Sequence, residues 1–289
     1  MAGELRYFTS EEVSNILGVH VSSVKRWTDQ GKLECTRTAG GHRKFLFSHL
    51  ADFLSENQDK VEQAHLFPIH SEEDIEISYS ILKGQFPDLQ EYVLENALGQ
   101  NREAVQQVLN GLYLAQHPLH TIYDHVMTPV MHRLGALWED QTLSVFEEHF
   151  ASQTIRDAII RLQGTLQLPR EKNGTAICLT FSTELHDIAI KMVDHILEER
   201  GFRVLFSGQL TPLFNVDRIF QQQEFDRVYL SSTYVGDRNL LQFEMNHLTG
   251  LCREYECQLF IGGQGFKLLE YDPDVVTRHL KSFQEVSDS

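Results

Sequence analysis

The sequence is poor in cysteine, tryptophan and proline, with four Cys, two Trp and seven Pro among 289 residues. The cysteines are scattered, with neither the paired spacing of a disulfide framework nor that of a zinc site, which fits a reducing cytosol. No apolar run reaches the length of a membrane span, and the N-terminus lacks the basic head and apolar stretch of a signal peptide. We therefore expect a cytoplasmic protein with no membrane partner.

Positive charge is also scarce, because 25 Lys and Arg stand against 41 Asp and Glu and give a formal net charge of −16. This balance argues against a surface that binds nucleic acid everywhere. The shortage is uneven, however: residues 1–60 contain eight basic and eight acidic residues, and six of the basic ones lie between Lys25 and Lys44. A local basic patch on an acidic protein indicates DNA contact at one end of the chain.

Changes of pattern along the chain predict a multidomain protein of α plus α/β class. Residues 1–56 alternate short helical and turn signals, and residues 57–71 are a polar linker without a clear period. Residues 72–168 carry helix-spaced apolar stripes that predict a four-helix bundle. Residues 169–289 alternate short apolar runs with helical stretches, which predicts a Rossmann-like (flavodoxin-like) parallel sheet. The expected strands are 175–181, 202–208, 226–233 and 257–263.

Two short helices and a basic hairpin open the chain. Thr9 is expected to cap the first helix and Ser22 or Ser23 the second, while Gly40 and Gly41 suit a hairpin tip. One interpretation of these residues is a helical docking module in which the basic residues are incidental. We expect instead a helix-turn-helix with a wing that grips double-stranded DNA. The predicted DNA contacts are Ser23, Lys25, Arg26, Arg37, His42, Arg43 and Lys44.

These motifs resemble the MerR-type winged-helix family. The match runs from Leu17-Gly18-Val19 to Trp27 and continues in the hairpin Arg37-Thr38-Ala39-Gly40-Gly41-His42-Arg43, which is similar to the family's T-P-G-G-H-R wing. Ala39 stands where the family usually has proline, so the wing loses rigidity but no charge. The resemblance of this part covers about residues 6–57.

Two further spacings matter because single residues within them are uninformative. Nine residues separate Trp138 from the pair Glu148-His149. A lone Trp is more often core than ligand contact, and a lone Glu-His pair is more often a solvated helix face. In the C-terminal part, Glu184-x-His186-x-x-Ala189 is followed after 41 residues by Ser231-x-Thr233, and after 28 more by Gly262-Gly263.

The first spacing resembles the helical bundle of MerR-type cobalamin-binding photoreceptor regulators, and the second resembles the cobalamin-binding domain of methionine synthase and B12 mutases. The resemblance implies that His186 is the lower cobalt ligand and that Glu184 orients its ring. It further implies that Trp138 shields the upper face of the corrin while Glu148 and His149 line the upper ligand's pocket. The cofactor tail would be lined by Asp187, Ser231, Thr233, Gly262 and Gly263.

The departures are Glu for the family's Asp at 184, Thr for Leu at 233, Ala for Gly at 189, and Glu139 where some members have a second His. The Ala189 methyl group is the departure expected to narrow the tail slot.

The family resemblance implies a non-enzymatic transcriptional regulator controlled by adenosylcobalamin. It implies a dark homo-oligomer, a tetramer, that presents several wings to DNA, and light that breaks the cobalt–carbon bond and dissociates it. Two alternatives stay open. One is a corrinoid methyl carrier of a methyltransferase system, which shares the bundle and sheet but has no use for a wing. The other is a regulator of the same fold that senses another chromophore, such as a linear tetrapyrrole.

Overall fold

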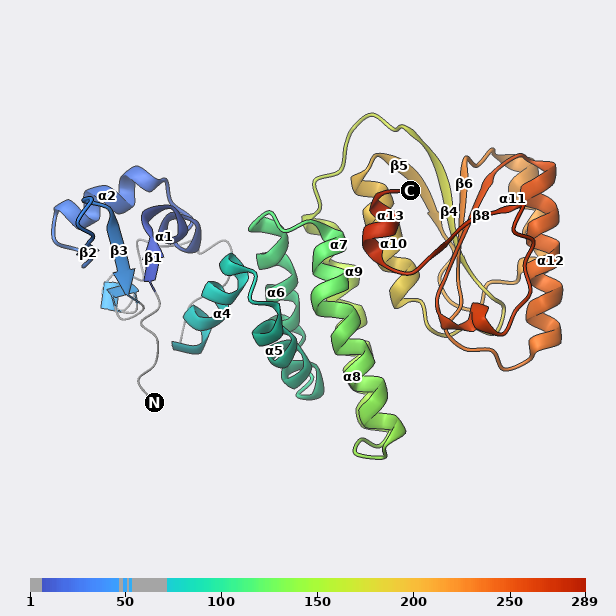
Figure 1. The fold of residues 1–289 in the computed structure, drawn as a ribbon, viewed down its shortest axis with the longest axis horizontal. Helices are drawn as coiled ribbons and strands as arrows, with labels where there is room; N and C mark the ends of the chain where they lie inside the picture. The colour runs from blue at the N-terminus through green and yellow to red at the C-terminus, as the bar shows by residue number, and fades with distance from the viewer. Residues whose placement is uncertain (1–6, 47–48, 51, 54–71) are drawn as a thin grey trace. The chain divides into compact units, whose positions relative to one another are not determined.

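The structure is a computed structural model that describes residues 7–46, 49–50, 52–53 and 72–289 (Figure 1). The chain forms two compact units. The N-terminal unit comprises Met1–Pro118 and His125–Ala158, and the C-terminal unit comprises Leu119–Asp124 and Ile159–Ser289. The chain therefore passes from one unit to the other three times. The expected linker, 57–71, lies outside the described residues. Within the described ranges, no helix is long and apolar enough to cross a membrane.

A three-stranded antiparallel sheet and two helices form the winged-helix part of the N-terminal unit. The sheet order is β1-β3-β2, with Phe8 of β1 opposite Phe45 of β3. Both rings are buried together with Val24, so the apolar residues of the expected helix-turn-helix share one small core. The elements are β1 (Tyr7–Thr9), α1 (Ser10–Ile16), α2 (Val21–Asp29), β2 (Thr36–Arg37) and β3 (Arg43–Leu46).

The two helix starts differ in how well the sequence predicts them. Thr9 Oγ1 accepts the N–H of Glu12, and the Glu12 carboxylate accepts the N–H of Thr9 in return, which completes a capping box. The expected serine cap of the second helix is wrong. Helix α2 begins at Val21, and Nδ1 of His20 accepts the N–H of Ser22 at 3.2 Å. An imidazole nitrogen serves as cap acceptor here in place of a hydroxyl.

Amphipathic helices make up the rest of the N-terminal unit. Their buried stripes, such as Val105, Val108 and Leu112 of α6, recur at helical spacing as the sequence predicts. Helix α4 also contacts the winged-helix core, because Ile75 is buried in it and the Tyr79 ring meets Phe8 edge to face. The helices are α4 (Glu72–Lys83), α5 (Phe86–Leu98), α6 (Arg102–Leu114), α8 (Thr128–Glu139) and α9 (Val145–Leu162), whose last residues, from Ile159 on, belong to the C-terminal unit.

A π-helical turn, η2 (Tyr123–Met127), joins the short helix α7 (Leu119–Ile122) to α8 without a break. Pro129 lies at the start of α8 and has no N–H, so it cannot donate to the carbonyl of His125. The side-chain amide of Gln90 donates to that carbonyl instead, at 2.8 Å. The wider π-helical turn thus accommodates a proline inside a long helix.

Five parallel strands form the sheet of the C-terminal unit, in the order β5-β4-β6-β7-β8. The four expected strands are all present. The edge strand β8 was not expected, and a register shift at Leu259/Phe260 marks its pairing with β7. The strand order reverses between β4 and β6, which is the point where open α/β sheets bind ligands. The strands are β4 (Gly174–Thr180), β5 (Phe202–Phe206), β6 (Arg227–Ser231), β7 (Gln258–Gly262) and β8 (Val276–Leu280).

Helices cover both faces of this sheet, with α10 and α13 on one side and α11 and α12 on the other (Figure 1). Leu241, Met245 and Leu248 of α12 are fully buried and share the main core with inward residues of β4, β6 and β7. The prediction of a parallel sheet covered on both faces is confirmed. The helices are α10 (Ile188–Glu199), α11 (Asp217–Gln222), α12 (Arg238–Glu254) and α13 (Phe283–Ser287).

Candidate cofactor and DNA-binding sites

Glu184 is the centre of the loop that follows β4 at the sheet's point of reversal. Its side chain is 1% exposed. One carboxylate oxygen, Oε1, accepts the N–H of His186 at 3.0 Å and its ring Nδ1–H at 2.5 Å. The other, Oε2, accepts the backbone N–H groups of Thr233 at 2.6 Å and Tyr234 at 3.0 Å. Glu184 therefore ties the His186 loop to the loop that follows β6.

These hydrogen bonds fix both the charge of Glu184 and the tautomer of His186. Burial by itself raises the pKa of Glu184, but the bonds from the His186 ring and from the three backbone N–H groups outweigh it, so the pKa lies below its usual value. The carboxylate is ionised and holds the proton of His186 on Nδ1, which leaves the lone pair on Nε2. The imidazole is 59% exposed. This is the arrangement of a histidine metal ligand backed by a carboxylate.

The strands next to this loop end in the predicted tail residues. Ser231 is the last residue of β6 and pairs in register with Thr180 of β4 and Gly262 of β7. Asp187 lies buried just before α10, where its carboxylate accepts the Gln209 side-chain amide at 3.3 Å. The structure therefore brings Glu184, His186, Asp187, Ser231, Thr233, Gly262 and Gly263 together on the loops and strand ends of β4, β6 and β7.

Steric contacts within the unit explain one of the two predicted glycines and not the other. Gly263 has φ +102°, and a Cβ there would lie 2.2 Å from the Ser232 carbonyl oxygen, so the chain's own packing requires glycine. A Cβ on Gly262 would meet only the Leu280 carbonyl oxygen at 3.6 Å, an ordinary contact. Packing within the unit therefore does not explain Gly262, and close approach of a ligand is a reason that remains.

The motifs did not indicate two buried polar groups near this loop. Glu244 of α12 is fully buried; its Oε2 accepts the N–H of Ser182, the second residue after β4, at 3.1 Å. Its Oε1 and the hydroxyl of buried Ser232 find no hydrogen-bond partner in the part of the chain that the structure describes. The available signal was the position of Glu244 on the apolar stripe of α12, beside Leu241 and Met245.

The other predicted cofactor residues belong to the N-terminal unit, at the turn between α8 and α9. Trp138 lies in the last turn of α8 and is 47% exposed, and His149 is exposed in the first turns of α9. Glu148 is half-buried and accepts the Ser152 hydroxyl at 2.5 Å. Three large apolar side chains in the first turns of α9 expose between 49% and 74% of their surface, as apolar groups of a binding surface do. They are Val145, Phe146 and Phe150.

The predicted DNA-binding residues gather on α2 and the wing. Lys25 and Arg26 are exposed on α2, Ser23 is half-buried in its first turns, and His42 is exposed at the hairpin tip. Gly41, at φ +77°, closes that tip by donating its N–H to the Thr38 carbonyl at 2.8 Å. Lys44 is half-buried in β3, paired in register with Thr36.

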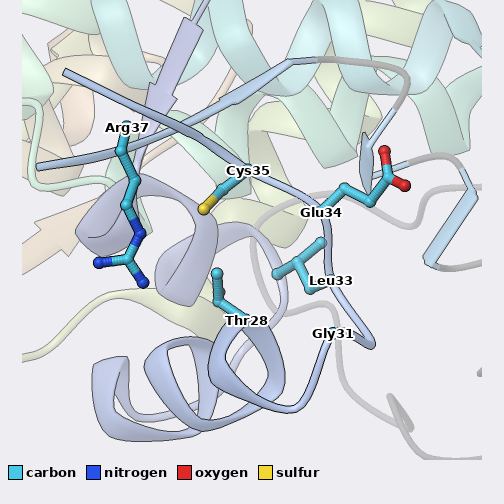
Figure 2. Close-up of a pocket in the computed structure, with 6 residues that line it drawn as sticks. All are labelled: Thr28, Gly31, Leu33, Glu34, Cys35 and Arg37. Carbon is cyan, nitrogen blue, oxygen red and sulfur yellow. The ribbon is translucent and has the colours of Figure 1, made fainter.

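Asp29 at the end of α2 pairs with both wing arginines. Its carboxylate lies 2.5 Å from the Arg43 guanidinium and 3.3 Å from that of Arg37. The Arg43 side chain is only 17% exposed, so it fastens the wing to α2. Arg37 also lines an open hollow of about 440 Å³ together with Thr28 and Cys35 (Figure 2). The sequence motifs did not predict this hollow.

Two family models match parts of the chain, the winged-helix part and the helices that follow it. Residues 7–58 match the model of a helix-turn-helix domain, and residues 89–163 match the model of a B12 binding domain. The HTH-type transcriptional repressor CarH of Myxococcus xanthus is 27% identical over 245 residues, which cover 80% of each protein. The monomethylamine corrinoid protein of Methanosarcina barkeri has a similar structure, with a TM-score of 0.57, 15% identity, and coverage of 70% of this chain and 96% of that one.

These matches confirm the resemblance that the motifs indicated. The chain combines a helix-turn-helix DNA-binding domain with a B12-binding domain, and it is similar over most of its length to a transcriptional repressor. The corrinoid protein, at 15% identity, shows only that the fold is shared.

The residues present fit cobalamin. A corrin brings four nitrogen ligands to cobalt, so the protein needs to add one donor, and His186 presents Nε2 with the other ring nitrogen held by Glu184. Within the described ranges, no three His, Cys, Asp or Glu side chains gather as a metal site of their own. Gly262 leaves the carboxyl end of β7 without a side chain, and Trp138 has an exposed flat ring.

Proposed function

We propose that this protein is a transcriptional regulator whose DNA binding is controlled by adenosylcobalamin and by light. The observation that carries the proposal is the Glu184–His186 pair at the reversal point of the sheet, in a chain that also has a helix-turn-helix. When bound, adenosylcobalamin supplies a cobalt–carbon bond that light can break. The protein is a regulator rather than an enzyme, because a wing has no role in methyl transfer.

The chain's own residues have distinct tasks in this proposal. His186 would bind cobalt through Nε2, and Glu184 keeps the proton on Nδ1. Trp138 would exclude water from the cobalt–carbon bond, while Glu148 and His149 would bond the hydroxyls of the adenosyl group. Ser231, Thr233 and Gly262 line the tail of the cofactor.

The oligomer is the output of the switch. Contacts with the upper ligand favour one geometry of the protein, and that geometry favours a tetramer with several wings on double-stranded DNA. Loss of those contacts in light removes this preference, so the tetramer dissociates and DNA is released. Similarity to the transcriptional repressor CarH supports the regulatory assignment.

Absorption spectra test the cofactor assignment. Purified protein should bind adenosylcobalamin with one equivalent per chain, and His186→Ala should shift the cobalt spectrum. His247→Ala is the matched control, because His247 belongs to the same unit and also pairs with a carboxylate, that of Asp217 at 2.9 Å. If neither adenosyl- nor methylcobalamin changes the spectrum or the melting temperature of the protein, the cofactor assignment is wrong. A pigment other than a corrinoid would favour the alternative chromophore.

A further inference from the structure

The loop that follows β5 makes hydrogen bonds to the loop that carries His186. The side-chain amide of Gln209 donates to the carbonyl oxygen of Leu185 at 2.5 Å and to a carboxyl oxygen of Asp187 at 3.3 Å. These two acceptors belong to the residues immediately before and after His186 in the sequence. A single side chain therefore holds the candidate cobalt ligand from both sides along the chain.

The neighbouring residue adds a backbone contact to the same loop. The N–H of Leu210 donates to the carbonyl oxygen of Glu184 at 3.0 Å. Leu210 has φ +53°, in the left-handed region that residues other than glycine rarely adopt. It is also 49% exposed, so packing of its side chain does not account for this conformation. The hydrogen bonds that Gln209 and Leu210 make to residues 184–187 do account for it.

Hydroxyl groups hold the base of this loop on the sheet. The hydroxyl of Thr180, the last residue of β4, donates to the carbonyl oxygen of Gly208 at 2.8 Å. Thr211 is buried, and its hydroxyl lies 2.6 Å from the hydroxyl of Ser207 and 3.3 Å from that of Thr180. The residues around Gln209 are thus fixed to the ends of β4 and β5, which gives its side chain a rigid support.

Glu184 and Gln209 act on different parts of the candidate ligand. Glu184 fixes the ring of His186 by accepting its Nδ1–H, whereas Gln209 holds the residues on both sides of it. We propose that Gln209 is a positioning residue that sets where Nε2 of His186 lies, and thereby how strongly it binds cobalt. This inference rests on the proposed function, in which His186 is the lower cobalt ligand. The sequence motifs did not indicate Gln209.

Hydrogen exchange tests these contacts in protein without cofactor. Gln209→Ala removes the donor, so the loop of residues 184–187 should open more often. The amides of His186 and Leu210, which donate to the side chain and to the carbonyl of Glu184, report this opening. They should exchange about 2- to 13-fold faster, the range expected for the loss of one hydrogen bond. Unchanged exchange at both amides would overturn the inference.

Two further variants separate loss of the donor from loss of the side chain. Gln209→Glu keeps the size, but an ionised carboxylate has no hydrogen to donate, so it should behave like Gln209→Ala. Gln242→Ala is the matched control in the same unit. The amide of Gln242 also donates to one backbone carbonyl, that of Glu270 at 2.7 Å, and to one side-chain oxygen, that of Asn246 at 3.0 Å. Its loss should leave exchange at His186 unchanged, and an equal acceleration would contradict a specific role of Gln209.

A double-mutant cycle tests the role toward cobalt. With His186 present, Gln209→Ala should weaken the affinity for adenosylcobalamin by about 2- to 13-fold at unchanged stoichiometry, as measured by absorbance titration. In the His186→Ala background the same change should have no effect, because no imidazole remains to be positioned. A residue that only shapes the loop, or that touches the cofactor itself, would weaken binding equally in both backgrounds.

The possible results separate this inference from the proposed function. Equal weakening in both backgrounds, or weakening in neither, overturns the positioning role and leaves the cofactor assignment intact. A parent protein that binds no cobalamin, or whose cobalt spectrum His186→Ala does not change, overturns the proposed cofactor site. The role of Gln209 toward cobalt then fails with it, whatever the exchange data show.

Discussion

Two neighbouring glycines at the end of β7 allow packing and ligand binding to be separated. Gly263→Ala puts a Cβ onto the Ser232 carbonyl at a positive φ, so the free energy of unfolding should fall by at least about 2 kcal/mol. Gly262→Ala meets only an ordinary contact and should change stability by less than about 0.5 kcal/mol. It should nevertheless weaken cobalamin binding, as measured by absorbance titration. Unchanged affinity in Gly262→Ala would remove this residue from the tail site.

A buried histidine gives the protein a pH dependence that does not involve the cofactor. Burial, assisted by the charge of Lys191, lowers the pKa of His195 from 6.5 to about 3. The unfolded chain binds a proton near pH 6.5 while the native state does not, so this contribution is fully present above pH 6.5. It is lost as the pH falls towards 3, by about 1.4 kcal/mol per pH unit.

The hydrogen-bonded pair Tyr123–His195 allows this to be measured. Replacing both partners with apolar residues, in Tyr123→Phe/His195→Leu, removes the titrating group without leaving either partner unpaired. Between pH 7 and pH 5 the unfolding midpoint of the parent protein should therefore fall further than that of the double variant, without cofactor in either. Parallel pH profiles would show that His195 takes up its proton in the native state as well.

Individual site residues stand out in the sequence only where a motif fixes their spacing. Glu184 and His186 stand out because two further segments of the same motif follow at the family's distances, and the hydrogen bond between them agrees with the proposed roles. Glu244 has no such partner motif, and its burial depends on which face of α12 meets the sheet. Sequence alone does not rank neighbouring polar side chains as helix caps or as ion-pair partners. It therefore does not single out His20 as the cap of α2 or Asp29 as the partner of Arg43.

At the scale of elements, the wing should act through charge and through its attachment to α2. Lys44→Ala should weaken binding to all DNA sequences alike and reduce the slope of log affinity against log salt by about one. Arg43→Ala should cost more, because it also breaks the pair with Asp29. Anisotropy titrations over a range of KCl concentrations measure both.

Changes on α2 provide the contrast to the wing variants. Lys25→Ala and Arg26→Ala, like changes at Ser23, should alter preference among DNA sequences instead of affecting all of them equally. An unchanged salt slope after loss of both Arg43 and Lys44 would point to a protein-docking role for residues 1–56.

The elements themselves were predictable in proportion to their apolar content. The strands β4 to β7 are short apolar runs and were expected, whereas β8 reads Val-Thr-Arg-His-Leu and lies at the sheet edge, where polar residues are tolerated. The π-helical turn was not expected, because Pro129 shows that the carbonyl of His125 loses its helical donor, but not that the turn widens or that Gln90 satisfies this carbonyl.

For the whole molecule, light should change the oligomer through the upper ligand's contacts. Size-exclusion chromatography of protein with adenosylcobalamin should give a tetramer in the dark and a smaller species after illumination. Trp138→Ala should weaken this response more than it weakens cobalamin binding, because His186 still binds cobalt. The same elution volume in dark and light, with the cofactor demonstrably bound, would leave a sensor of B12 level without a light response.

The route of the chain between its two units has a consequence for how this gene can be cut. Residues Leu119–Asp124 belong to the C-terminal unit, yet the sequence on either side of them belongs to the N-terminal unit. A truncation at residue 158 would therefore remove the partners of Tyr123 and Asp124 and leave an apolar helical turn without its cover. A fragment that begins at residue 159 would lose the Asp124 carboxylate, which accepts the first two N–H groups of α13. Expression of either half alone, or recombination with a related regulator at a single crossover, should give poorly folded products. An exchange that also carries residues 119–124 should give a better folded protein.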